Sequence, residues 1–199
     1  MKPPKRNRGL RIAHSFDRGM GKVKIVASPA LQKSLKYEIV DDPRSPGRGQ
    51  VLKITIPGGD YKGLKNDLGF LRVNVEMPDT PPAPTRALIF DGRLVAAPGS
   101  FSHSNIYLYS AGPRTERSFR VYPMRLTGRG WQRYFLSRWN NRESSRVLNK
   151  ISDAKVLTVS FFFHDIKEPV EIRIGNVGDT MAKTSDAPVW WEGGEAEPI

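Results

Sequence analysis

Short runs of alternating apolar and polar residues, separated by turn-forming residues, most constrain the fold of this 199-residue chain. In the clearest run, Leu71, Val73 and Val75 alternate with arginine, asparagine and glutamate and end at Pro78. Successive strand residues point to opposite faces, so such a run fits a sheet with one face on a core. Similar runs cover residues 22–27, 35–39, 51–56, 86–90, 93–97, 105–109, 118–126, 155–163 and 170–174. The pattern predicts a mostly β fold, an antiparallel β-sandwich or barrel that includes the jelly roll as one arrangement.

Two strand pairings can be predicted from local sequence. Asp91-Gly92 lies between two apolar runs, and this dipeptide favours a tight hairpin turn. The run over residues 155–163 is the most apolar in the chain and predicts a central buried strand, with residues 170–174 as its hairpin partner. Pro123 interrupts another run and predicts an edge strand, because proline cannot donate to a sheet ladder.

One main helix is predicted near residues 131–150. At about 100° per residue, Trp131, Phe135 and Trp139 would share one face. Arg138, Arg142 and Arg146 would continue that face, so the helix would begin aromatic and end cationic. The alternative is that the aromatic side chains pack on a sheet while the arginines point into solvent near the helix C-terminus.

Positive charge is concentrated in two segments of a chain whose net charge is +12. Residues 1–24 hold eight Lys or Arg and one Asp, and residues 114–150 hold nine Arg and one Lys against two Glu. Clustered cations of this kind indicate a polyanionic partner. We therefore expect a flexible basic N-terminal arm over residues 1–21, a single β-rich domain over 22–188, and a Trp-Trp anchor with an acidic tail over 189–199.

These clusters predict a non-enzymatic protein that binds RNA or DNA with little sequence preference, such as a viral coat, packaging or nucleoprotein component. Edge strands and terminal segments also predict a homo-oligomer, because both are natural contacts between copies of a chain. An alternative is a peripheral, matrix-like protein that binds an anionic membrane surface and a partner protein. The residues predicted to bind nucleic acid are Lys5, Arg6, Arg8, Arg11, Arg129, Arg133, Arg138, Arg142, Arg146, Trp131, Tyr134 and Trp139.

The sequence offers little for catalysis or cofactor binding. It has no cysteine and three dispersed histidines, so no metal-ligand spacing and no cofactor motif is recognisable. His164-Asp165 is the best fragment of a catalytic site, and it supports only the alternative of a metal-dependent hydrolase acting on nucleic acid or a phosphorylated substrate. No secretory signal peptide is recognisable at Met1, which predicts a cytoplasmic, nuclear or virion-associated protein.

Overall fold

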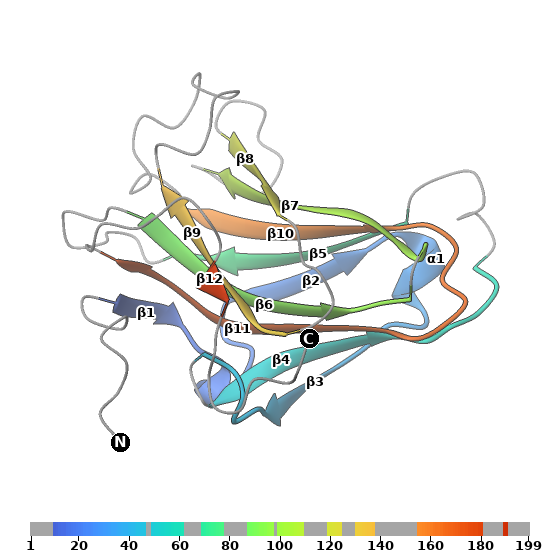
Figure 1. The fold of residues 1–199 in the computed structure, drawn as a ribbon, viewed down its shortest axis with the longest axis horizontal. Coiled ribbons are helices and arrows are strands. Elements are labelled where there is room, and N and C mark those ends of the chain that lie inside the picture. The colour runs from blue at the N-terminus through green and yellow to red at the C-terminus, as the bar shows by residue number, and fades with distance from the viewer. Residues whose placement is uncertain are drawn as a thin grey trace.

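The chain folds into two antiparallel β-sheets packed face to face (Figure 1). The computed structural model describes residues 10–46, 49–61, 69–77, 87–97, 99–109, 119–124, 130–137, 155–180 and 189–190. The seven-stranded sheet consists of β12 (Val189–Trp190), β9 (Gln132–Ser137), β6 (Ala87–Val95), β11 (Val170–Thr180), β4 (Gln50–Ile56) and β3 (Lys36–Asp41), with β1 (Leu10–His14) beside β11. The five-stranded sheet consists of β2 (Val23–Ala27), β5 (Gly69–Glu76), β10 (Val156–Phe163), β7 (Phe101–Tyr109) and β8 (Phe119–Met124). Two short helical elements, η2 (Phe16–Arg18) and α1 (Pro29–Gln32), connect strands.

The core lies between the sheets and is built by the alternation seen in the sequence. Leu71, Val73 and Val75 of β5 are fully buried, and they pack in one cluster with Ile54 of β4 and Ile172 of β11. Inward residues of the strands thus meet across the two sheets, as period-two patterning requires. The predicted mostly β sandwich is confirmed.

The most apolar strand, β10, is central in its sheet, between β5 and β7, as predicted. Its predicted hairpin partner is wrong, because β11 pairs with β4, β6 and β1 in the other sheet. The connection after His164 crosses from one sheet to the other, and Ile166 within it is fully buried. Burying that side chain between the sheets favours the crossing over a local turn.

The predicted hairpin at Asp91-Gly92 is also wrong, since β6 runs straight through both residues. Asp91 lies opposite Arg133 of β9, and the two side chains form a buried ion pair. This contact with Arg133 keeps Asp91 within the sheet and outweighs the preference of Asp91-Gly92 for a tight turn.

The helix predicted near residues 131–150 is wrong where the structure describes that segment. Gln132–Ser137 form β9, which pairs with β6 and, at its start, with β12. Tyr134 points into the core cluster, whereas its neighbour Arg133 pairs with Asp91 on the opposite face of the sheet. Successive side chains on opposite faces have the two-residue period of a strand, not the 3.6-residue period of a helix. Residues 138–150 lie outside the described ranges.

The predicted arm over residues 1–21 overlaps the folded domain. Residues 10–14 form β1 against β11, and Phe16 in η2 is fully buried in the core. Residues 10–21 therefore belong to the folded domain, whereas residues 1–9 are not described. Near the other end of the chain, Trp190 lies in the two-residue edge strand β12. Across the described ranges, no helix is long and apolar enough to span a membrane.

Candidate functional site

The outer face of the five-stranded sheet carries an unusual mixture of aromatic and polar side chains, which we call the platform. It is formed by the outward residues of β5, β10 and β7, the three central strands of that sheet in Figure 1. Cross-strand register arranges them in three rows. These rows are Phe70–Phe162–His103, Arg72–Ser160–Asn105 and Asn74–Thr158–Tyr107.

Stacking holds the platform's aromatic rings in fixed orientations. The ring of His103, which is exposed, lies 4.4 Å from that of Phe162 at an interplanar angle of 13°. Tyr107 and Tyr109 lie nearly parallel, with their ring centroids 6.2 Å apart. The guanidinium carbon of Arg72 sits 4.3 Å from the centroid of the Phe70 ring, a cation–π contact. Stacked rings lose little freedom when a ligand binds, so this surface is preorganised.

Hydrogen-bonding groups lie between the rings. The hydroxyl of Thr158 donates to Asn74 Oδ1 at 2.7 Å, and the amide of Asn105 donates to the hydroxyl of Tyr107 at 3.3 Å. Because Asn74 accepts this bond through Oδ1, its amide nitrogen remains as a hydrogen-bond donor. Ser160, at the centre of the middle row, is fully buried, and its Oγ has no hydrogen-bond partner among the described residues. The platform therefore offers flat aromatic faces together with the amides of Asn74 and Asn105 and the phenol group of Tyr107, whereas the hydroxyls of Thr158 and Ser160 are buried.

The outer face of the seven-stranded sheet has a different character, because its described charges largely neutralise one another. Lys53 pairs with Glu38 at 3.0 Å and with Glu171 at 3.9 Å. Arg173 contacts Glu171 and the buried Asp42, each at 2.7 Å. These contacts raise the pKa of Arg173 despite the opposing effect of its burial. The network therefore engages the positive charges of Lys53 and Arg173 within the sheet itself.

Three residues predicted to bind nucleic acid lie in the buried part of this same sheet. Trp131, Arg133 and Tyr134 are 3%, 4% and 7% exposed, respectively. The indole nitrogen of Trp131 donates to Asp42 Oδ2 at 3.2 Å, and the hydroxyl of Tyr134 donates to Gln132 Oε1. Burial raises the pKa of Tyr134. Rings covered in this way present no face on which a base could stack.

Arg133 donates two hydrogen bonds to Asp91, from Nε to Oδ1 at 2.7 Å and from Nη2 to Oδ2 at 2.8 Å. Asp91 is fully buried, and this desolvation raises its pKa while the Arg133 guanidinium acts to lower it. A bidentate pair of this kind is structural, so Arg133 is committed to the fold rather than to a phosphate.

The remaining predicted binding residues are not placed as side chains by the structure. Arg11 lies in β1, opposite Asp179 of β11. The others lie outside the described ranges: Lys5, Arg6, Arg8, Arg129, Arg138, Trp139, Arg142 and Arg146.

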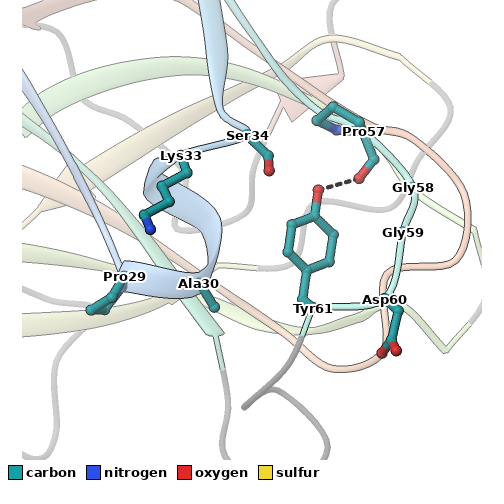
Figure 2. A pocket seen from close by; sticks show the side chains of 9 residues that line it. All are labelled: Pro29, Ala30, Lys33, Ser34, Pro57, Gly58, Gly59, Asp60 and Tyr61. Carbon is teal, nitrogen blue, oxygen red and sulfur yellow. Dashed lines mark hydrogen bonds between the residues drawn. The ribbon is translucent and has the colours of Figure 1, made fainter.

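A pocket of about 600 Å³ opens at the end of the sandwich, between α1 and the segment that follows β4 (Figure 2). Lys33, Ser34 and Asp60 contribute polar groups to it, and the ring of Tyr61 lies across it with its hydroxyl donating to the carbonyl of Pro57. Burial raises the pKa of Tyr61, an effect that a hydrogen bond with Ser34 partly offsets. The pocket combines one aromatic ring with few convergent polar groups.

The predicted catalytic fragment, His164-Asp165, lies at the surface of the described part of the chain. His164 and Asp165 are both exposed, and Asp165 pairs with Lys167 at 3.2 Å. Within the described ranges, no cluster of three or more His, Asp or Glu side chains could hold a metal ion.

Comparison with solved structures identifies similar folds. The chain resembles a family 11 carbohydrate-binding module of Clostridium thermocellum in complex with a β-1,3-1,4-mixed-linked tetrasaccharide (TM-score 0.52, 13% identity, covering 86% of this chain and 95% of the module). It also resembles the family 11 module of a cellulosomal cellulase of that organism (TM-score 0.53, 14% identity, 87% and 95%). A third match is a carbohydrate-binding module of the β-sandwich superfamily with promiscuous specificity (TM-score 0.50, 12% identity, 86% and 62%). No protein-family model matches the sequence, and no curated protein matches it significantly.

These findings correct the predicted function. The three matching folds named above belong to carbohydrate-binding modules, and they overturn the prediction of a nucleic-acid-binding coat or packaging protein. The same correction applies to nucleic acid as a partner, and neither the lipid-binding alternative nor the expected homo-oligomer gains support.

The platform was not predicted from the sequence. In each alternating run, the outward residues were interpreted only as solvent-facing positions, without regard to which side chains they carry. A signal was available: the outward positions of β5 hold phenylalanine, arginine and asparagine, and those of β7 hold histidine, asparagine and tyrosine. Amide and aromatic residues concentrated on one solvent face are typical of a binding surface.

Proposed function

We propose that this protein is a non-catalytic carbohydrate-binding module and that the platform is its binding surface. Sugar rings present apolar C–H faces and a rim of hydroxyl groups. Aromatic rings bind the first by dispersion and apolar burial, and amides and hydroxyls bind the second by hydrogen bonds. The platform supplies both kinds of group on one rigid sheet.

The observation that carries the proposal is the row Asn74–Thr158–Tyr107, in which a half-buried amide and a half-buried phenol ring lie on either side of Thr158. Thr158 is 1% exposed, and its hydroxyl holds the Asn74 amide in place rather than facing a ligand. Adjacent strands lie about 4.8 Å apart, so the row extends about 10 Å across the sheet. Such a row can accommodate a short stretch of a glycan chain laid across the strands. The folds of the three carbohydrate-binding modules support this reading.

A matched pair of tyrosine variants tests the proposal. Tyr107→Ala removes a half-buried platform ring, whereas Tyr37→Ala removes a ring that is 55% exposed on β3 of the other sheet. We expect Tyr107→Ala to weaken polysaccharide binding about tenfold, which is about 1.4 kcal/mol, and Tyr37→Ala to leave it unchanged. Affinity gel electrophoresis against a panel of neutral and acidic polysaccharides measures both. Equal mobility of the two variants in every gel would refute the platform as the site.

A further inference from the structure

We propose that the glycan bound by the platform is acidic, carrying carboxylate or sulfate groups; this inference rests on the proposed function and adds the class of ligand. The starting observation is the outward charge of the sheet. Among the described outward positions of β2, β5, β10 and β7, the Lys and Arg residues are Lys24 and Arg72, and the one carboxylate is that of Glu76. Lys22 directly precedes β2.

Glu76 is already engaged at the edge of the sheet. Its carboxylate lies 3.7 Å from the ammonium of Lys22, and both side chains are largely exposed. The pair leaves Lys24 as the cation that continues the platform's third row. Lys24 is opposite Asn74, which is opposite Thr158, which is opposite Tyr107. A cation, an amide and an aromatic ring thus lie in line across four strands, with the buried Thr158 between the amide and the ring, and the row spans about 14 Å.

Lys24 is exposed and has no ion-pair or hydrogen-bond partner in the described part of the chain. On the other sheet, by contrast, Lys53 and Arg173 are held by carboxylates. A glycan whose sugar ring stacks on Tyr107 would extend along the row toward Lys24. The ammonium of Lys24 could then pair with an anionic substituent of that glycan. The chain's net charge of +12 would favour the approach of such a polymer from solution.

Two matched pairs of polysaccharides separate charge from sugar structure. Polygalacturonate is compared with its methyl ester, which keeps the backbone and removes the carboxylate charge, and dextran sulfate is compared with dextran. The two pairs also distinguish a carboxylate from a sulfate ligand. Affinities of the full chain are measured by titration calorimetry at low and at moderate salt, because added salt screens exposed charge pairs.

The variants are Lys24→Gln and, as its control, Lys36→Gln on β3 of the other sheet. Lys36 is also an exposed strand lysine without a described partner, so both changes remove one positive charge from a similar setting. We expect Lys24→Gln to weaken binding of the charged polymer about two- to fivefold, as for an exposed ion pair. Lys36→Gln should leave binding unchanged, and neither variant should alter binding of an uncharged polymer.

The outcomes separate this inference from the proposed function. If neutral polymers bind as tightly as charged ones and Tyr107→Ala weakens both, the acidic ligand is refuted and the carbohydrate site stands. If Lys24→Gln and Lys36→Gln weaken binding equally, the attraction belongs to the whole chain and the inference fails. If no polysaccharide binds, or if Tyr107→Ala has no effect on any of them, both proposals fail.

Discussion

Replacing Arg133 by methionine is expected to destabilise the protein strongly, because it leaves the carboxylate of Asp91 buried without its partner. Asp91 is fully buried and Arg133 is 4% exposed, so no water can replace the two lost hydrogen bonds. Breaking a buried ion pair from one side costs about 3–5 kcal/mol. For a chain of this size, that loss lowers Tm by about 6–20 °C. Urea unfolding followed by circular dichroism measures the free energy directly.

The loss should depend on pH with a definite sign. Burial raises the pKa of Asp91, and Arg133 opposes this rise, so the pKa should rise further in Arg133→Met. A raised carboxyl pKa means that the folded state binds the proton more tightly than the unfolded state. Its contribution to stability is therefore present below the ordinary pKa of 3.8 and is lost as pH rises through the folded-state pKa. Arg133→Met should be less destabilised at pH 5 than at pH 7.

Two controls test the reasoning. Arg93→Met removes a half-buried arginine of β6 that has no described ion pair, so it should cost less than about 1 kcal/mol. The double variant Asp91→Leu with Arg133→Met replaces both charges by apolar groups and should recover most of the loss. The account would be refuted if Arg133→Met cost no more than Arg93→Met, or if its loss were the same at pH 5 and pH 7.

Two further substitutions test local packing. Gly58→Ala should destabilise the protein by about 1–3 kcal/mol, because a Cβ there would lie 2.2 Å from the backbone oxygen of Lys167. At Gly59 the nearest atom to an added Cβ would be a ring carbon of Tyr61 at 3.9 Å, so Gly59→Ala should be tolerated. Similar thermal melts for the two alanine variants would contradict this. Ser160→Ala should leave stability unchanged or raise it by up to about 1 kcal/mol, because the buried hydroxyl has no hydrogen-bond partner in the part of the chain that the structure describes. A clear loss of stability in urea unfolding would reveal a hydrogen bond that this account omits.

The fold class could be predicted from sequence because each strand's alternation records which side chains face the core. Leu71, Val73 and Val75 are buried as their spacing requires, and β10 is central as its apolar content indicates. Pro123 lies in β8, an edge strand of its sheet, as proline requires. The pairing of distant strands could not be predicted, since Val170 and its neighbours fit a partner in either sheet equally well by pattern alone.

The predicted helix shows why the site could not be found in the same way. Trp131 and Phe135 are four residues apart, which suits one face of a helix, yet neighbouring Arg133 finds its partner in Asp91, 42 positions earlier in the chain. The density of positive charge predicted that Arg133 lies on a ligand-binding surface, but in the structure Arg133 is buried and paired with Asp91. The platform, in contrast, exists only through the register of β5, β10 and β7, which no local pattern specifies.

The most direct test of the platform is to map a bound oligosaccharide onto the sheets by amide chemical-shift changes. Titration with a short acidic oligosaccharide is expected to move the signals of residues 70–74, 103–107 and 158–162, with Lys24 at the end of the affected surface. Changes confined to the outer face of the other sheet around Arg173, or to the pocket around Tyr61, would contradict the account.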